Sequence, residues 1–197
     1  AGSPWSGSDH VHPNADAHGC VHVWDVWNDV DLDRYRDRTP RFVAEFGWQA
    51  PPSVRTLEEY LGQDALNRST PAWASHQKAT DGDLKLDRGI AARFGPITDF
   101  EAFCYAAHVV QARAIRTGIE HFRSLRPYCM GTVWWQLNDC WPVTSWAVVD
   151  SRARRKPGWY ALRDAYRPRL LTVQPRGGAL VVVAVNETAS PWHVRTD

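Results

Sequence analysis

The chain has 197 residues, enough for one domain with a sizeable core or for one domain and part of another. Its formal net charge is +1, so the charge balance points to neither a nucleic acid nor an anionic membrane as a partner. No apolar run approaches the roughly 18 residues that span a bilayer. We therefore expect no nucleic-acid partner and no membrane partner.

Cysteine and tryptophan are the informative parts of the composition. The cysteines are widely spaced and form no CxxC pair, which favours four thiols, a reducing compartment and a cytoplasmic location over a secreted or lysosomal one; they are Cys20, Cys104, Cys129 and Cys140. The eleven tryptophans can pack in a core, and they can also stack on sugars or on bases. Because the tryptophan-rich segments are not basic, they favour a sugar over a nucleic acid.

The first part of the chain predicts a loop and two strands. Residues 1–19 are rich in Gly, Ser, Pro, His and Asp without periodicity, which predicts a loop. Residues 20–27 (CVHVWDVW) alternate in the manner of a strand, and the charged residues 28–40 predict a loop or a short helix. The apolar run of residues 41–46, which Glu45 interrupts, predicts the second strand.

The middle of the chain predicts two helices and a buried strand. Residues 54–66 place apolar side chains at helical spacing, and a polar connection follows. Residues 98–124 predict the longest helix, which Thr98 and Glu101 begin as a capping box. Residues 129–137 (CMGTVWWQL) predict a buried strand with polar residues directly after it.

The last part predicts a helix over residues 158–166, then a β-hairpin whose strands are residues 170–174 and 180–185. Strands that alternate with helices favour a parallel α/β sheet or a (β/α)8 barrel, which keeps its active site at the C-terminal ends of its strands. We expect residues 1–168 to form the α/β domain and residues 169–197 to begin a β-domain.

The first motif that suggests chemistry is RFVAEFGWQ, residues 41–49. A carboxylate at the end of an apolar strand loses hydration, which costs free energy unless hydrogen bonds or a counter-charge compensate. Glu45 is therefore either the ion-pair partner of a neighbouring arginine or an active-site carboxylate, and the pattern alone leaves both open. Arg41 is a doubtful partner because it lies four residues away along the strand.

The second motif is GTVWWQLNDCWP, residues 131–142. The period of a strand sends its two adjacent tryptophans to opposite faces, so that Trp135 shares one face with Leu137 and Asp139, and Trp134 shares the other with Gln136 and Asn138. An aromatic platform beside amides and carboxylates suits a sugar, which has hydroxyl groups at its rim and C–H bonds on its faces.

Together the two motifs closely resemble the β-mannosidases of glycoside hydrolase family 2. RFVAEFGWQAPPS resembles the strand that carries the nucleophile, and GTVWWQLNDCWPVTSWAVVD resembles the strand after it. Four shorter segments resemble the family in the same order: HVWDVW at 22–27, ASHQK at 74–78, RPYCMGT at 126–132 and KPGWYAL at 156–162.

This resemblance covers about residues 3–168. It implies the C-terminal half, about strands 5–8, of a (β/α)8 TIM barrel, followed by the start of an immunoglobulin-like β-sandwich domain.

The resemblance also implies a function and a site. The implied activity is the hydrolysis of terminal non-reducing β-D-mannose residues by double displacement, with a β-mannoside or manno-oligosaccharide as substrate and without a cofactor. Glu45 would be the nucleophile, Trp135 the aromatic floor under the mannose, and Gln77 a partner for a sugar hydroxyl. Four further residues would line or support the site: Trp24, His22, Asn138 and Asp139.

One part of that site is missing from the sequence. The family's acid/base is a glutamate directly after an asparagine, upstream of the nucleophile, and the only such pair here is Asn186-Glu187 in the terminal hairpin. Gly2-Ser3-Pro4-Trp5 resembles the family near its fifth strand. We therefore expect a fragment that is inactive alone, and whose open strand edges pair with the missing N-terminal half of the barrel or with a second copy.

Two readings of the histidine-rich residues 9–22 remain open. Their His, Asp and Cys spacing is compatible with a structural zinc site, but a solvated active-site loop is the simpler reading, so no metal is expected. Two alternative functions also remain: another family 2 exo-glycosidase, such as a β-galactosidase or exo-β-glucosaminidase, and a non-catalytic carbohydrate-binding fragment.

Overall fold

The computed structural model describes residues 12, 14–62 and 66–195 of the chain. Within them, three short parallel strands form one sheet in the order β1-β2-β3: β1 is Val21–Val23, β2 is Val43–Phe46 and β3 is Thr132–Trp134. The predicted parallel sheet is thus confirmed. The expected position near a fifth barrel strand, at residues 2–5, lies outside the described residues.

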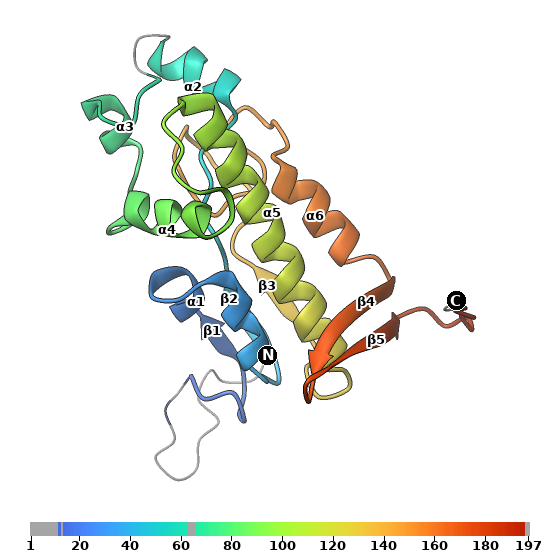
Figure 1. Cartoon of the computed structure of the whole chain (residues 1–197). Coiled ribbons are helices and arrows are strands. Elements are labelled where there is room, and N and C mark those ends of the chain that lie inside the picture. The colour runs from blue at the N-terminus through green and yellow to red at the C-terminus, as the bar shows by residue number, and fades with distance from the viewer. Residues whose placement is uncertain (1–11, 13, 63–65, 196–197) are drawn as a thin grey trace.

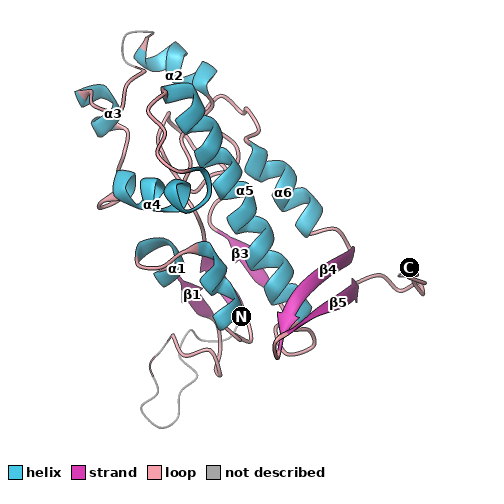
Figure 2. Cartoon of the chain, viewed as in Figure 1, coloured by secondary structure: helices cyan, strands magenta, loops and turns pink. Residues whose placement is uncertain are grey.

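Helices cover one face of this sheet (Figures 1 and 2). The long helix α5 (Phe100–Ser124) packs against β3, against α6 (Pro157–Ala165) and against the 3-10 helix η1 (Leu32–Asp37). Helices α2 (Val54–Leu61), α3 (Pro71–Ser75) and α4 (Gly82–Phe94) all belong to the connection that leaves the C-terminal end of β2.

The long predicted helix is confirmed, but its expected cap is wrong. Asp99, not Thr98, is the N-cap of α5, because its carboxylate accepts a 2.8 Å hydrogen bond from the backbone N–H of Ala102. The N-cap lies one residue after the predicted one, because the side chains of Thr98 and Asp99 are both of types that can accept such a hydrogen bond. By contrast, Ser53 caps α2 with its side-chain oxygen, just before the predicted start.

The strand expected over residues 20–27 is also wrong in its second half. It ends at Val23, and Asp25–Asn28 form the one-turn helix α1. That turn buries the adjacent residues Val26 and Trp27 together, which a strand would send to opposite faces. Over four residues, alternation and a single helical turn are not distinguishable from the sequence.

Sequence reasoning missed α3 and α4, which lie in the connection expected to be merely polar. The apolar contribution of α4 to the core is small, because only Leu86 and Ile90 of its side chains are buried there. Its packing depends instead on Gly89: a Cβ atom at this position would lie 2.6 Å from the ring of Trp48.

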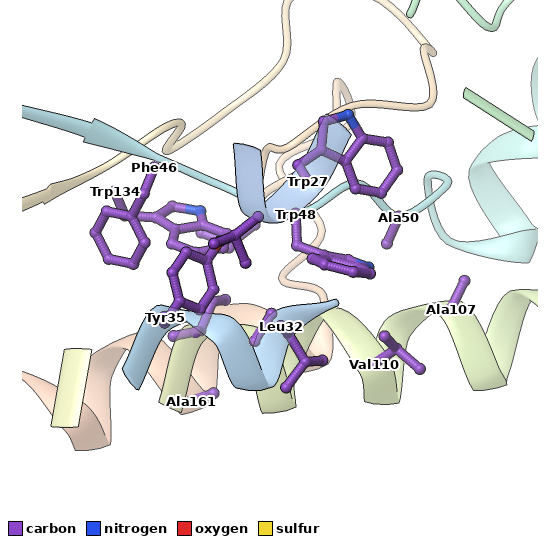
Figure 3. Packing of buried hydrophobic residues seen from close by; sticks show 14 of the residues in the cluster. Trp27, Leu32, Tyr35, Phe46, Trp48, Ala50, Ala107, Val110, Trp134 and Ala161 are labelled. Atoms are coloured by element: carbon purple, nitrogen blue, oxygen red, sulfur yellow. The ribbon is translucent and has the colours of Figure 1, made fainter. Parts of the chain in front are cut away.

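The core between sheet and helices is aromatic (Figure 3). Phe46 of β2 makes edge-to-face contacts with Tyr35 and Trp134 at centroid distances of 5.5 and 5.1 Å, and Trp27 meets Trp48 in the same way at 5.2 Å. Such pairs add about 0.5–1.5 kcal/mol each beyond the area they bury. Several of the tryptophans therefore serve packing.

The opposite face of the sheet carries no helix in the described residues. His22 of β1 is accessible between two buried valines, and Glu45 of β2 and Val133 of β3 are accessible as well. The barrel lumen of a complete (β/α)8 fold would lie on this side.

The terminal hairpin is confirmed as β4 (Arg169–Arg176) paired antiparallel with β5 (Ala179–Asn186). Gly177 and Gly178 both have positive φ, as the tight turn between two strands requires. Hydrogen bonds of 2.6 Å from Thr172 to Glu120, and from Arg176 to Ser124, attach the hairpin to α5. The domain boundary after residue 168 stays a prediction.

None of the four cysteines forms a disulfide. Among the described residues, no helix combines the length and the apolar character that crossing a membrane requires.

Candidate active site

Glu45 lies near the C-terminal end of β2, directly across from His22 of β1 in the strand register. The indole Nε1 of Trp24 donates a 3.1 Å hydrogen bond to Oε2 of Glu45, and Nδ1 of His22 lies 3.5 Å from the same oxygen. The carboxylate is half-buried, with 29% of the side chain exposed.

The arginine alternative for Glu45 does not hold among the described residues, where no lysine or arginine lies within ion-pair distance of its carboxylate. Arg41 turns away: its Nε donates to the carbonyl oxygen of Ala17, and its guanidinium stacks over the ring of Tyr128. Oε2 of Glu45 is held by two ring nitrogens, and within the described residues Oε1 has no hydrogen-bond partner.

An open pocket of about 460 Å³ surrounds Glu45, a size within the range of small-molecule sites. Four tryptophans form much of its wall: Trp24, Trp27, Trp135 and Trp146. Trp24 and Trp146 meet edge to face at 5.6 Å, which fixes their rings relative to each other. Glu45 is the only carboxylate among the described residues of this lining.

Trp135 confirms the predicted split of the two adjacent tryptophans. Trp134 is 8% exposed and packs in the core, whereas Trp135 is 42% exposed and lines the pocket. Gly47 makes the approach of Trp135 to β2 feasible, because a Cβ atom there would lie 2.3 Å from the Trp135 carbonyl oxygen and 2.8 Å from the Trp146 ring. The Trp135–Gln136 peptide bond is cis.

Gln77 lies beside the pocket rather than on its lining. Its Oε1 accepts a 3.1 Å hydrogen bond from the backbone N–H of Ala79, and its Nε2 donates to Asp83 at 3.4 Å. The amide thus shapes the turn that brings Ala79 and Thr80 to the pocket. A direct contact of Gln77 with a sugar stays a prediction.

Asn138 and Asp139 organise the loop that follows β3. The hydroxyl of Ser145 donates to both carboxylate oxygens of Asp139 at 2.8 Å, and Gln136 donates to one of them at 3.3 Å. Burial raises the pKa of Asp139, partly offset by the Ser145 bond and the charge of Lys156. The exposed Asn138 bonds the Asp139 carbonyl at 3.5 Å. Neither residue lines the pocket.

Lys156 lies beneath the same loop and is 1% exposed. Its ammonium donates a 3.0 Å hydrogen bond to the carbonyl oxygen of Ala50. Burial lowers its pKa to about 8, against the opposing charges of Asp139 and Asp150. Lys156 therefore attaches the loop after β3 to the segment that leaves β2.

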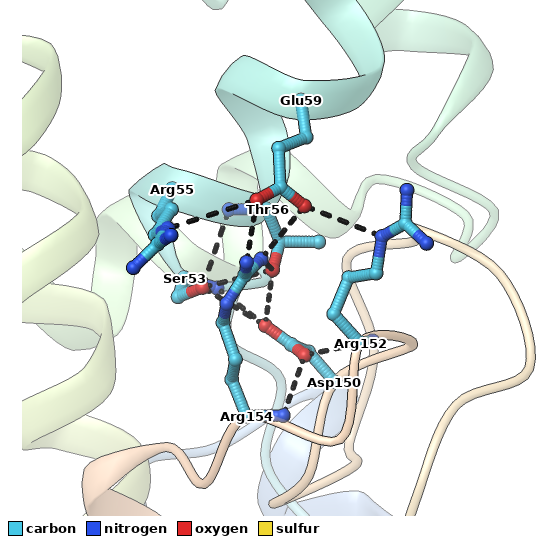
Figure 4. A network of polar contacts seen from close by, with 7 residues as sticks. All are labelled: Ser53, Arg55, Thr56, Glu59, Asp150, Arg152 and Arg154. Carbon is cyan, nitrogen blue, oxygen red and sulfur yellow. Dashed lines mark hydrogen bonds and ion pairs between the residues drawn. The ribbon is translucent and has the colours of Figure 1, made fainter.

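Asp150 joins these two segments a second time (Figure 4). Its Oδ2 accepts hydrogen bonds from the hydroxyls of Ser53 at 2.9 Å and Thr56 at 2.7 Å, at the start of α2. Its Oδ1 accepts from the backbone N–H groups of Arg152 and Arg154, both at 3.0 Å. No motif in the sequence indicated this network.

Sequence reasoning also missed several residues of the pocket. Trp27 and Trp146 fall within segments that resemble the family but were not assigned a role, whereas Asn28, Thr80 and Lys85 had no motif that marked them. Asn28, Thr80 and Lys85 lie in connections whose fold the sequence did not predict, and that fold brings them to the pocket.

No group of three or more His, Cys, Asp or Glu side chains that could hold a metal occurs among the described residues. The hypothesis of a zinc site in residues 9–22 falls partly on residues 9–11 and 13, which lie outside them.

Comparison with known proteins gives consistent relatives, although no family model matches the chain. β-Mannosidase B of Emericella nidulans is 31% identical over 181 residues, which cover 88% of this chain and 21% of that protein. β-Mannosidase B of Aspergillus flavus is 32% identical over 175 residues, which cover 85% of this chain and 20% of that protein.

Solved structures agree with these relatives. A β-D-mannosidase from Dictyoglomus thermophilum superposes with a TM-score of 0.88 at 35% identity, covering 94% of this chain and 23% of that one. An exo-chitosanase of Amycolatopsis orientalis superposes with a TM-score of 0.62 at 18% identity, covering 83% and 21%, and this likeness concerns the fold alone.

The relatives agree with the site, which has a carboxylate at the end of a parallel strand in a pocket of tryptophans. The chain belongs to glycoside hydrolase family 2. Within that family its similarity is to the β-mannosidases, and the chain spans about a fifth of the length of the curated relatives it matches.

Proposed function

We propose that this chain supplies the nucleophile part of a retaining β-mannosidase, as about strands 5–8 of a barrel whose first half and acid/base glutamate belong to a longer protein. The β4–β5 hairpin would then begin the next, immunoglobulin-like domain. The observation that carries the proposal is the setting of Glu45: its Oε2 is held by Trp24 and His22 in a tryptophan-walled pocket.

The chemistry follows from that setting. Because Oε2 is engaged, Oε1 is the oxygen available to attack the anomeric carbon of a bound mannoside. The new bond from Glu45 to this carbon forms as the bond to the leaving oxygen breaks, and water later hydrolyses the glycosyl ester. Trp135 supplies the apolar surface on which the sugar ring stacks.

Protonation of the leaving oxygen requires a second carboxyl group about 5–5.5 Å from the nucleophile in a retaining enzyme. The described lining of the pocket offers none besides Glu45. We therefore expect negligible hydrolysis of aryl β-mannosides by this chain alone. Turnover at the rate of a complete family member would contradict the absence of the acid/base.

Covalent labelling tests the nucleophile without an acid. The reagent 2-deoxy-2-fluoro-β-D-mannosyl fluoride has a leaving group that departs as fluoride, and its 2-fluoro group slows hydrolysis of the ester that forms. Mass spectrometry of digested chain should find the label on Glu45, and Glu45→Gln should abolish it. Glu101→Gln, at the exposed start of α5, is the matched control and should label normally. A label on another carboxylate would overturn the assignment.

The same assay separates the alternatives. Faster labelling by the corresponding galactosyl or glucosyl fluoride would indicate a sister exo-glycosidase activity. A non-catalytic carbohydrate-binding role is the second candidate, because the described lining of the pocket combines four tryptophans with a single carboxylate. That role predicts that Glu45→Ala binds a β-mannoside as tightly as the unmodified chain does. It also predicts that Glu45 of the unmodified chain is not labelled.

A further inference from the structure

Two polar side chains from different connections meet on the wall of the pocket that contains Glu45. Lys85 lies in the first turn of α4, and its ammonium donates a 2.9 Å hydrogen bond to Oδ1 of Asn28, the last residue of α1. Both residues line the pocket. Neither belongs to the segments that resemble the family, so nothing in the sequence assigned them a role.

Lys85 has hydrogen-bonding capacity to spare. An ammonium carries three N–H donors, and Asn28 accepts from one of them. Within the described part of the chain, no carboxylate lies within ion-pair distance of Lys85. The other cations of α4 are engaged differently: Arg88 donates to the carbonyl oxygens of Trp27, Asn28 and Val30, and Arg93 pairs with Asp31.

The position of the pair relative to Glu45 is fixed by α1. The backbone N–H of Asn28 donates to the carbonyl of Trp24, so the two residues share one face of the helix a single turn apart, about 5.4 Å. Trp24 holds Glu45, and Asn28 holds Lys85. The polar pair therefore lies about one helical turn from the residue that orients Glu45, on the lining of the same pocket.

The wall that carries Lys85 is firmly attached. The 2.7 Å hydrogen bond from Arg88 to Trp27 ties α4 to α1, and the close contact of Gly89 with Trp48 ties it to the core. Because these contacts hold the backbone that carries Lys85, less freedom is lost there when a ligand binds, which favours affinity.

We propose that the Lys85 ammonium and the Asn28 amide bind a ring hydroxyl of the β-mannoside, away from the carbon that Glu45 attacks, and so help to select the sugar. This inference rests on the proposed function of the same pocket. A hydroxyl oxygen accepts from both donors, and a site that bonds a hydroxyl rejects the analogue without it.

Binding of deoxygenated sugars tests the pair. The unmodified chain is titrated by calorimetry with methyl β-D-mannopyranoside and with each of its monodeoxy analogues. We expect one analogue to bind at least tenfold more weakly than the parent, the effect of a lost hydrogen bond to a charged donor. In Lys85→Met most of that difference should be lost, because the charged donor is gone and only the Asn28 amide remains to bond the hydroxyl.

A second variant and a control separate this effect from misfolding. Asn28→Asp keeps the lysine but pairs its ammonium with a carboxylate, and should lose the same discrimination. Lys78→Met makes the same chemical change at a lysine whose Nζ lies 5.7 Å from the Trp141 ring centroid, off the pocket lining, and should keep it. Circular dichroism and thermal unfolding check that each variant folds.

The outcomes are distinguishable. Full discrimination in Lys85→Met, with the parent sugar still bound, would overturn this inference and leave Glu45 as the proposed nucleophile. Absence of both binding to the parent sugar and labelling at Glu45 in the unmodified chain would overturn the proposed function, and this inference with it.

Discussion

Glu45 is oriented by two ring nitrogens rather than by an arginine or a lysine. His22 reaches one of its oxygens from the neighbouring strand β1, and Trp24 reaches the same oxygen from the turn after that strand. On its other side, β2 closely approaches the segment after β3, where the N–H of Trp135 donates to the carbonyl of Phe46 at 2.9 Å. Gly47 is the residue that allows it.

Gly47→Ala should damage the site more than the fold. The added Cβ meets the Trp135 carbonyl at 2.3 Å, so Trp135 must move, and we expect a loss of about 1–3 kcal/mol of unfolding free energy together with at least tenfold slower labelling of Glu45. Thermal unfolding and the fluorosugar assay measure the two effects. Gly158→Ala is the crowded control in α6, where a Cβ meets Gln111 at 2.9 Å; equal labelling rates in the two variants would contradict this view.

At the scale of elements, the loop after β3 is held by two aspartates with opposite electrostatics. Asp150 is penalised by burial, but the hydrogen bonds it accepts from Thr56, Ser53 and backbone N–H groups outweigh that penalty and lower its pKa. At Asp139 burial prevails and the pKa is raised. The two carboxylates should therefore respond to acid in opposite directions.

Asparagine substitutions test these opposite effects of pH on stability. Because the folded pKa of Asp150 is lowered, its contribution is present at neutral pH and is lost as the pH falls through that value, below about 4. We expect Asp150→Asn to cost about 2 kcal/mol at neutral pH and progressively less in acid. Asp139 has a raised folded pKa, so the unmodified chain should gain stability over Asp139→Asn as the pH falls. Urea denaturation across the acidic range measures both, and parallel pH dependences would refute the assignment.

At the scale of the whole molecule, the parallel sheet has helices on one face in the described residues. Parallel sheets occur almost only with both faces covered, yet Val133 and Trp135 stand 49% and 42% exposed on the open side. Under the proposed function, the upstream half of the barrel covers this face. In its absence, we expect a second copy of the chain to cover this face and to pair with its open strand edges.

Val133→Lys should therefore reduce self-association without loss of stability. The side chain is exposed, so the unfolding free energy should change by no more than about 0.5 kcal/mol, while the lysine opposes burial of this face in a dimer. Sedimentation velocity over a range of concentrations measures the effect. Leu84→Lys, on the outer surface of α4 and 69% exposed, is the control and should leave association unchanged. Equal association in both variants would exclude this face as the contact.

The sequence by itself determined the elements whose apolar pattern is long or bounded by clear stop signals. The stripe of α5, the run that forms β2 and the glycine turn of the hairpin are local features, so they were predictable. The placement of Glu45 and Trp135 at one pocket was also predictable, because the resemblance to the family marked both residues, while their roles stay predictions.

Only the tertiary structure decided which side chains meet. The one-turn helix α1 and the helix α4, which buries few side chains, have too few core-facing residues for a periodic signal. Their packing depends on contacts with Trp48 and the core. These two helices carry Asn28 and Lys85, 57 residues apart in the chain, to one wall of the pocket. Periodicity reports on neighbours along the chain, and such an encounter is set by packing across it.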